Sequence, residues 1–307
     1  MSEIRTKIEE NKLILQKLLK NKDNQKSLLQ WLMTELAYTS NAIEGNTLTR
    51  KETALAIEED ITSGSKPIKH YQEAKNHAKA FEFIQDAAHN NIQIDQDFVL
   101  QIHKHILSGI DDMNAGFYRS VKVRISGSQT ILPNPIKVPD LMNQFGTWLT
   151  NKDDDLLLKA IEAHYRLVTI HPFVDGNGRT ARLLLDAMLI EAGYQPIIIR
   201  KIDRKRYLTS LETYQTRENS EPYYNFMLNA MNRSLKTMID LLDVNVKEAD
   251  DKMLTIAKFA KYVDVPVSTV RYYMKQGKIR PVTFTPSGYA LFEENQKADM
   301  LDLLNKE

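Results

Sequence analysis

The spacing of apolar residues over the first 110 positions predicts a bundle of amphipathic helices, because apolar side chains recur there at helical period. The pattern runs through Ile14, Leu15, Leu18, Leu19, Leu28, Leu29, Leu32, Leu36 and Ile43. Gly45 is expected to end this helix, as glycine commonly does at a helix C-terminus. The run Thr49–Glu52 has the spacing of a capping box, so another helix is expected to begin there.

A strand-like pattern follows between the predicted helices. Five residues alternate between apolar and polar side chains, which is the period of a strand: Val121, Lys122, Val123, Arg124 and Ile125. Ser126-Gly127-Ser128 supplies a turn and residues 130–132 a short return strand. We therefore expect a β-hairpin here, before helical spacing resumes at residues 141–168 and 180–192.

The last part of the chain predicts a small module of its own. Residues 254–277 have the pattern of two helices joined by a turn, and residues 281–292 suggest two short strands around Pro286-Ser287-Gly288. This order of elements is that of a winged helix-turn-helix. A polar stretch at residues 244–252 marks the boundary. We expect a mainly α protein with three regions, residues 1–110, 111–247 and 248–307.

Composition narrows the classes of function. The chain has 307 residues, a formal net charge of 41 − 40 = +1 and no cysteine. Overall charge therefore does not drive binding to nucleic acid or membranes, and disulfides and cysteine-based metal sites are excluded. The charged N-terminus lacks the apolar core of a signal peptide, and no apolar run approaches the length of a membrane span. A cytoplasmic protein that does not enter membranes is the expectation.

The candidate chemistry lies in residues 171–182, His-Pro-Phe-Val-Asp-Gly-Asn-Gly-Arg-Thr-Ala-Arg. Gly176, Asn177 and Gly178 form a glycine-flanked turn entering a helix, where successive backbone N–H groups bind anions. Arg179 and Arg182 lie three residues apart on one helix face, and two arginines beside such a turn suit a polyphosphate.

Two further side chains complete the constellation. His171 can accept a proton near neutral pH, and Asp175 can hold Mg²⁺ against phosphate oxygens. A base, a metal ligand, an anion-binding turn and paired arginines are the parts that phosphoryl or nucleotidyl transfer needs. An ordinary loop with solvated arginines explains any two of these features, but not all of them within twelve residues.

The run resembles the Fic family signature, His-Pro-Phe-x-Asp/Glu-Gly-Asn-Gly-Arg-x-x-Arg, and matches every defined position. The likeness extends to Ala115-Gly116-Phe117-Tyr118-Arg119, which looks like the family's lead-in to its flap hairpin. The resemblance implies a Fic-type helical bundle with a β-hairpin flap. It also implies transfer of AMP from ATP, with Mg²⁺, onto a Ser, Thr or Tyr hydroxyl of a target protein or of the protein itself.

The resemblance also assigns roles to residues. It implies that His171 deprotonates the target hydroxyl, that Asp175 holds Mg²⁺, and that the amides of Gly176–Gly178, together with Asn177, cradle the phosphates. Arg179 would contact the β-phosphate region and Arg182 the γ-phosphate.

Two of the family's variations concern the nucleotide. Gly178 argues against the Doc-like members, which carry lysine at that position and transfer phosphate, while other nucleotide or phosphocholine donors stay open. Tyr207 is a candidate for the adenosine pocket, although an aromatic residue there also suits the core.

A second motif stands at the end of the N-terminal helical pattern. Ser40, Glu44 and Gly45 match the Fic inhibitory motif Ser/Thr-x-x-x-Glu-Gly/Asn, and their place resembles the class whose inhibitory helix precedes the core. The resemblance implies that Glu44 pairs with Arg182 and keeps the γ-phosphate out. A plain glutamate at a helix end is the alternative. Glu44 could instead align a water that removes AMP from modified targets.

The partners stay open at this stage. The predicted flap strand Val121–Ile125 suits pairing with an extended target segment, or packing on its own domain. The run Val270-Arg271-Tyr272-Tyr273 resembles the MerR-like winged-helix group, and residues 252–280 carry 7 − 1 = +6 charges. This module suits DNA contact or protein docking, and the family resemblance allows a homodimer. Three hypotheses remain: an inhibited AMP transferase, a hydrolase that removes AMP, and a DNA-binding regulator with a nucleotide-sensing Fic core.

Overall fold

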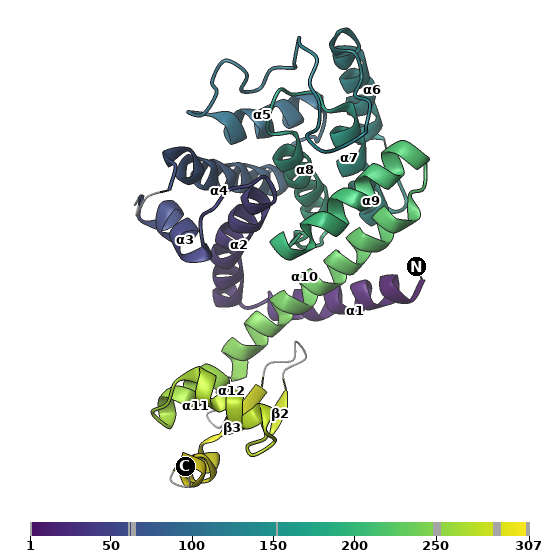
Figure 1. The fold of residues 1–307 in the computed structure, drawn as a ribbon. Helices are drawn as coiled ribbons and strands as arrows, with labels where there is room; N and C mark the ends of the chain where they lie inside the picture. Colours follow the sequence, from purple (N-terminus) through teal and green to yellow (C-terminus); the bar gives the residue numbers. More distant parts are fainter. Residues whose placement is uncertain are drawn as a thin grey trace. The chain divides into compact units, whose positions relative to one another are not determined.

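The computed structural model describes residues 2–60, 62, 66–151, 153–247, 253–284 and 290–304. The chain divides into two compact units (Figure 1): residues 1–12 with 29–234, and residues 13–28 with 235–307. The described residues are mainly helical, which confirms the expected fold class. No helix among them is long and apolar enough to cross a bilayer.

The helices of the described residues before position 248 are interrupted by a long non-helical connection at residues 108–134 and by 3₁₀ turns at Pro135–Lys137 and Lys201–Asp203. They are α1 (Ser2–Leu18), α2 (Lys22–Ile43), α3 (Arg50–Glu58), α4 (Ile68–His89), α5 (Gln96–Leu107), α6 (Val138–Thr150), α7 (Leu156–Ile170), α8 (Asn177–Glu191), α9 (Arg204–Arg217) and α10 (Glu221–Lys247).

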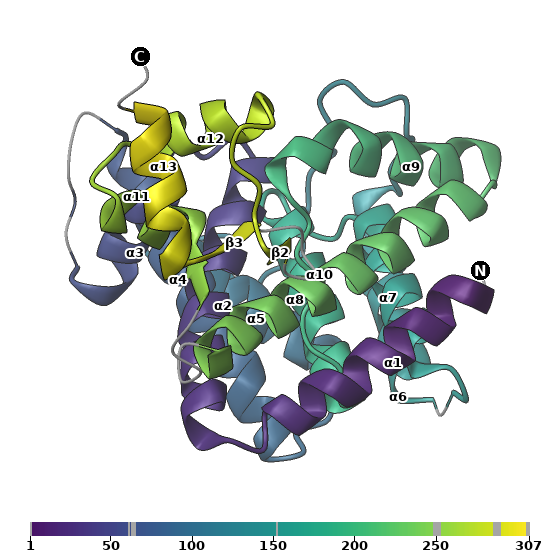
Figure 2. The same ribbon diagram turned by 90° about the horizontal axis from the view of Figure 1, so that it is seen from below.

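Helix α8 is the centre of the first unit. Figures 1 and 2 show it between α7 on one side and α4 and α5 on the other. Its residues from Thr180 to Leu189 are all buried, as expected for a helix surrounded by protein. The buried set includes charged side chains of the motif, Arg179 and Arg182, with Asp186 further along. Buried charges need partners, so α8 depends on polar groups from neighbouring helices.

Local signals account for several helix ends. Thr49 and Glu52 form the expected capping box at the start of α3, each side chain bonding the other residue's backbone. Gly45 follows the end of α2 with φ +99°, a conformation that favours glycine. Asn46 N then donates to Asn41 O at 3.0 Å, which is the bond of a Schellman motif. These bonds fix the direction in which the chain leaves α2.

The segment between α5 and α6 differs from the hairpin that the alternation predicted. Its arms meet at a turn where Ser128 N donates to Ile125 O at 3.2 Å, but residues 117–134 contain no strand. Their polar groups bond elsewhere: Ser128 Oγ and Gln129 N donate to Glu212 Oε1 of α9. The prediction of paired strands was therefore wrong, because tertiary bonds to α9 replace the cross-strand ladder.

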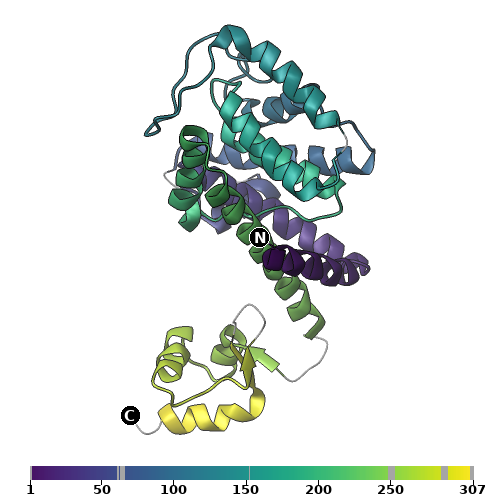
Figure 3. The same cartoon turned by 90° about the vertical axis from the view of Figure 1, so that its right-hand side faces the viewer.

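The C-terminal module of the second unit has the predicted order of helix, turn, helix and strands (Figure 3). Its elements are β1 (Met253–Thr255), α11 (Ile256–Tyr262), α12 (Val267–Lys275), β2 (Thr283–Phe284), β3 (Ala290–Glu293), a 3₁₀ turn (Glu294–Gln296) and α13 (Lys297–Leu304). The strands form an antiparallel sheet in the order β1-β3-β2, with Thr283 opposite Leu291 and Leu254 opposite Phe292. The predicted turn at Pro286-Ser287-Gly288 lies outside the described residues.

Candidate functional site

The motif loop, residues 171–176, connects α7 to α8, and the backbone turns sharply at its first residue. His171 follows the last residue of α7 in a left-handed conformation, φ 51° and ψ 59°, which non-glycine residues rarely adopt. Arg119 holds the bend: its Nε donates to His171 O at 2.8 Å and its backbone N to Pro172 O at 2.9 Å. Its Nη2 also donates to Pro133 O at 2.8 Å. The buried side chain of Arg119 thus joins the two ends of residues 117–134, here called the flap segment, to the motif loop.

The bonding of the His171 ring leaves one nitrogen available as a base. Nδ1 lies 3.2 Å from Val168 O. Because a carbonyl only accepts, Nδ1 carries the proton and Nε2 keeps its lone pair. Burial lowers the pKa of His171 below its usual value, and the charge of Arg119 lowers it further. The ring is therefore neutral at pH 7, as a general base requires.

Asn177 and Phe173 fasten the middle of the loop. Asn177 Oδ1 accepts from Phe173 N, and Asn177 Nδ2 donates to Phe173 O, both at 2.9 Å. The Phe173 ring is fully buried. The Asn177 side chain is thus occupied by the loop's own backbone. A phosphate contact at this position would have to come from the Asn177 backbone N–H.

His103 of α5 is a site residue that sequence reasoning missed. Its ring stacks on Phe173 with a centroid distance of 3.6 Å. Nδ1 accepts from Gly116 N at 3.0 Å, so Nε2 donates to Asp175 O, also at 3.0 Å. Burial lowers the pKa of His103 to about 4, which keeps this neutral tautomer. No local motif marks His103, since its partners lie 13 and 72 residues away.

Two glycines shape the entrance to α8. Gly176 has φ +79°, and an added Cβ would lie 3.3 Å from the ring of His103, so both backbone and space demand glycine there. A Cβ on Gly178 would lie 2.5 Å from Glu44 Oε1 and 3.1 Å from Arg182 Nη1. The carboxylate of Glu44 therefore lies directly over the first turn of α8, where the unpaired backbone N–H groups of a helix attract anions.

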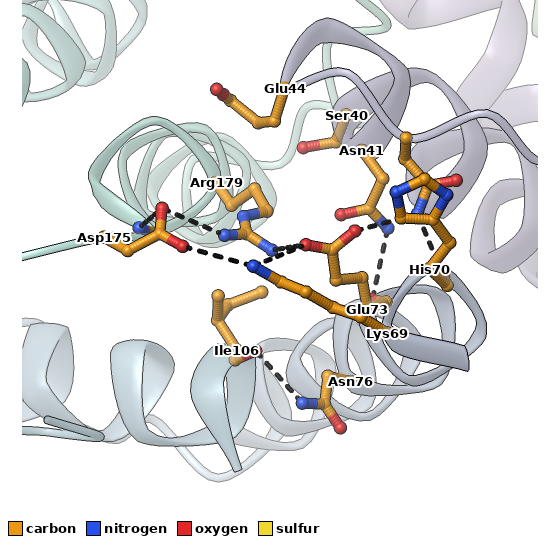
Figure 4. A network of polar contacts seen from close by, with 12 residues as sticks. Ser40, Asn41, Glu44, Lys69, His70, Glu73, Asn76, Ile106, Asp175 and Arg179 are labelled. Atoms are coloured by element: carbon orange, nitrogen blue, oxygen red, sulfur yellow. Dashed lines mark hydrogen bonds and ion pairs between the residues drawn. The ribbon is translucent and has the colours of Figure 1, made fainter. Parts of the chain in front are cut away.

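Asp175 presents a carboxylate beside this turn (Figure 4). Oδ1 accepts from Gly176 N at 2.6 Å and lies 3.4 Å from Arg179 Nη2. Oδ2 has Lys69 Nζ at 4.0 Å, and about half of the side chain is exposed. Burial raises the pKa of Asp175, but Arg179 and the Gly176 N–H outweigh it and lower the pKa overall. The carboxyl is ionised and open to a ligand.

Arg182 is bound by the end of α2. Its Nη2 donates to Glu44 Oε1 at 2.7 Å and to Ser40 O at 3.0 Å, and its Nε donates to Ser40 Oγ at 2.9 Å. The side chain of Arg182 is 7% exposed and that of Glu44 38%. Burial lowers the pKa of Arg182, but Glu44 and Tyr207 raise it above its usual value. The guanidinium is charged and occupied on the side facing α2.

Arg179 is bound by a different glutamate, which sequence reasoning did not find. Its Nη1 donates to Glu73 Oε1 of α4 at 3.2 Å. Both side chains are buried, with 3% and 10% exposure. Glu73 sits among ordinary helical residues, and no spacing rule connects it to a residue 106 positions away.

The position of Tyr207 corrects the expectation that it lines an adenosine pocket. Tyr207 is 1% exposed, and its hydroxyl bonds His164 Nε2 at 2.7 Å. His164 Nδ1 in turn meets Tyr223 OH at 2.7 Å, and that hydroxyl donates to Ile161 O. Since Tyr223 uses its proton on Ile161, His164 donates from Nδ1 and accepts from Tyr207. Tyr207 is therefore a core residue, and its side chain also interacts with Arg182.

Together these groups define a class of site: a neutral histidine and an ionised carboxylate at the N-terminus of a helix that carries two arginines. Such a site suits the chemistry of nucleoside polyphosphates. No group of three or more histidine, aspartate or glutamate side chains with metal-binding geometry occurs among the described residues. A single carboxylate suits Mg²⁺, which is commonly held by one or two carboxylates and by substrate phosphates.

Comparison with known proteins agrees with this class. Residues 93–189 match the Fic/DOC family, and residues 255–292 match the MerR family regulatory protein model. A protein adenylyltransferase Fic from Nematostella vectensis is 36% identical over 202 residues, which are 64% of this chain and 47% of the relative. The chain thus carries a Fic-type domain at residues 93–189. It spans about half of the length of this curated relative.

Solved structures of Fic proteins have the same fold. A Fic domain containing signaling protein from Bacteroides thetaiotaomicron superposes with a TM-score of 0.70 at 28% identity, covering 77% of this chain and 98% of that one. Fic-1 (residues 134–508) from C. elegans gives a TM-score of 0.71 at 25% identity and covers 80% and 74%. The resemblance of residues 171–182 to the Fic family signature is confirmed.

Proposed function

We propose that this protein transfers AMP from ATP to a hydroxyl of a target protein and that Glu44 inhibits the transfer. The observation that carries the proposal is the position of the Glu44 carboxylate. It bonds Arg182 at 2.7 Å and lies over Gly178, at the turn where phosphate would bind. Relatives named protein adenylyltransferase Fic support the choice of AMP over other transferred groups.

His171 is the proposed general base. Its Nε2 takes the proton of a Ser, Thr or Tyr hydroxyl as that oxygen attacks the α-phosphorus of ATP. The bond from the α-phosphorus to the β-phosphate bridging oxygen breaks, and pyrophosphate leaves. Arg119 and the Val168 carbonyl hold the ring so that Nε2 faces away from the backbone. A positioned base of this kind contributes roughly 10²–10⁴-fold to a rate.

The nucleotide is held by the motif residues. Asp175 would hold Mg²⁺, which neutralises charge on the phosphates when bound. The backbone amides of Gly176–Gly178 supply donors to phosphate oxygens, and Arg179 and Arg182 supply positive charge. The Asn177 side chain keeps the loop in the shape that points these amides outward, through its two bonds to Phe173.

Inhibition follows from competition for Arg182. A hydrogen bond to a charged group contributes about 1.5–3 kcal/mol, and the partial exposure of Glu44 places this pair at the lower end. The γ-phosphate would have to displace the carboxylate and would meet its negative charge. An inhibition of about tenfold or more is expected from the pair, since about 1.4 kcal/mol corresponds to a factor of ten.

The first experiment follows label from ATP carrying ³²P at the α-phosphate, with Mg²⁺ and a bacterial lysate. The Glu44→Gly variant should transfer at least about ten times more label than wild type, and adding His171→Ala to Glu44→Gly should reduce the transfer roughly 10²–10⁴-fold. Equal labelling by Glu44→Gly and wild type would contradict inhibition by Glu44. Loss of label from pre-modified targets with wild type, but not with Glu44→Gly, would favour the hydrolase in which Glu44 aligns the water.

The flap segment is the proposed docking place for the target. Its arms are not paired with each other, and Phe117, Val121 and Ile131 expose 65%, 54% and 95% of their surfaces. An extended target strand can pair with the arm Val121–Ile125 and cover these apolar side chains. Val123→Pro, which removes one backbone donor from the arm, should lower labelling of a protein target more than it lowers ATP binding.

We also propose that the C-terminal module contacts DNA. Arg271, Tyr272 and Lys275 are exposed on α12, and Lys278 and Arg280 follow it. The side of α12 that carries Val270 and Tyr273 packs in the module's core. A basic, aromatic face on the second helix of a winged helix-turn-helix suits the major groove. Binding to duplex DNA should weaken steeply with salt, and Arg271→Ala should weaken it, whereas salt-independent capture of protein alone would favour docking.

A further inference from the structure

The carboxylate of Glu73 binds one residue of the Fic signature, Arg179, and one residue just after the inhibitory motif, Asn46. One oxygen, Oε1, accepts from Arg179 Nη1 at 3.2 Å; the other, Oε2, accepts from Asn46 Nδ2 at 2.9 Å. Asn46 is the second residue after Glu44. Figure 4 shows Glu73 between Arg179 on α8 and the segment that follows α2.

The Arg179 side of this junction depends on Glu73. The guanidinium is almost fully buried, and its Nε finds no hydrogen-bond partner among the described residues. Its remaining bond is to Asp175 Oδ1 at 3.4 Å. A buried guanidinium with few bonds takes its direction from the strongest of them, so Glu73 sets where Arg179 points.

The α2 side is also fastened to Glu73 and its neighbours. Asn41 Nδ2 donates to Glu73 O at 3.1 Å, and Asn46 Nδ2 donates to His70 O at 2.9 Å as well as to the Glu73 carboxylate. These bonds bracket Glu44 on both sides along the chain. Lys69 adds only a longer contact, 3.9 Å from Glu73 Oε1, and its side chain is half exposed.

We propose that Glu73 is a positioning residue that couples Arg179 to the inhibitory segment. Its carboxylate aims Arg179 at the phosphates and, through Asn46, keeps Glu44 over Arg182 and Gly178. This inference rests on the proposed function. It predicts that loss of the carboxylate has two effects: the inhibition by Glu44 weakens, and the transfer seen without Glu44 slows.

The variants Glu73→Gln and Asn46→Ala separate the contact of Glu73 with Arg179 from its contact with Asn46. Glutamine keeps the length of the side chain but replaces one oxygen by an N–H donor, so it cannot accept from both Arg179 and Asn46. Asn46→Ala removes the link to the segment and leaves the Glu73–Arg179 pair. The matched control is Glu162→Gln, because Glu162 also pairs with an arginine, Arg166, and accepts from Tyr224 at 2.7 Å.

Labelling with α-³²P ATP is measured for the full chain. Inhibition is measured as the ratio of AMP transfer in the Glu44→Gly background to transfer with Glu44 present, and Glu73→Gln and Asn46→Ala should each lower this ratio about tenfold, the size expected for one bond to a charged group. In the Glu44→Gly background, Glu73→Gln should lower kcat about tenfold, because Arg179 is misaimed. The KM for ATP should stay within about twofold of its value in Glu44→Gly, because the substitution also removes the negative charge of Glu73, which opposes the binding of phosphate. Asn46→Ala and Glu162→Gln should leave kcat unchanged in that background.

A second readout does not depend on activity. Hydrogen exchange at the backbone amides of Glu44, Gly45 and Leu48 should be faster in Glu73→Gln and Asn46→Ala than in wild type or Glu162→Gln. Unchanged exchange, or an equal loss of activity in both backgrounds that follows thermal stability, would overturn the inference. If Glu44→Gly transfers no AMP, the proposed function fails, and the exchange result still decides whether Glu73 holds the segment.

Discussion

Arg179 and Arg182 lie one helical turn apart on α8, and each is bound by a glutamate from another part of the chain, yet the two pairs differ in character. Glu73 comes from the second turn of α4 and is 10% exposed, whereas Glu44 follows the end of α2 and is 38% exposed. Glu44 precedes Gly45, whose left-handed backbone already turns the chain away. A carboxylate at a helix end that water already reaches can leave its partner at small cost, but one inside a helix cannot.

This difference suggests a division of labour. The exposed pair suits a contact that opens when nucleotide binds, and the buried pair suits a fixed support. Position along the chain and access to water decide this, since the chemistry of the two pairs is the same. The predictions that follow test the comparison, beginning with the largest effect.

The comparison assumes that both arginines serve a reaction at His171. His171→Ala in the Glu44→Gly background should reduce AMP transfer roughly 10²–10⁴-fold, because the base is lost. ATP binding, measured by calorimetry, should change little, since His171 is not among the phosphate-binding groups. Residual transfer within about tenfold of Glu44→Gly would show that another group takes the proton.

Stability distinguishes the two pairs directly. Arg179→Met leaves Glu73 as a buried charge without its arginine and should destabilise the protein by about 3–5 kcal/mol. Arg182→Met leaves Glu44 where water can hydrate it and should cost less, about 1–2 kcal/mol. Urea unfolding of the two variants gives the values. Equal losses would remove the distinction between a fixed and an opening pair.

Two buried histidines near Arg182 make stability depend on pH. Burial, with the charge of Arg182, lowers the pKa of His77 to about 3 and that of His164 to about 3. As pH falls below about 6.5, the unfolded chain binds protons that the folded chain refuses. The stability present above that pH should therefore fall by about 1.4 kcal/mol per pH unit for each histidine. Urea midpoints between pH 7 and 5 measure the slope, which His77→Gln should make shallower.

The smallest predicted effect concerns Tyr207, the core residue that interacts with Arg182. Tyr207→Phe removes the hydroxyl that donates to His164 Nε2, leaving a buried acceptor unpaired, and should cost about 1–2 kcal/mol of stability. ATP affinity should fall less than twofold if Tyr207 lies in the core, since Arg182 keeps its bonds to α2. A loss of ATP affinity of about tenfold without loss of stability would restore Tyr207 to the adenosine pocket.

Much of the local structure was predictable from the sequence, because it depends on residues close together in the chain. The helical period, the capping box at Thr49 and the end of α2 at Gly45 each follow from neighbours within a turn or two. The same holds for the turn of Gly176–Gly178 and the spacing of Arg179 and Arg182. In the C-terminal module, the two helices and the strands β2 and β3 were predicted for the same reason, whereas β1 and α13 were not.

Only the tertiary structure decided which distant groups meet. Arg119, His103 and Glu73 hold the site through partners that lie between 13 and 106 residues away, and no local pattern encodes such distances. Alternation predicted paired strands at Val121–Ile125, but α9 supplies bonds that replace the ladder. Tyr207 lies in the core because its hydroxyl finds His164 there. Periodicity follows from the geometry of one element, whereas the partners of buried polar groups follow from how the elements pack.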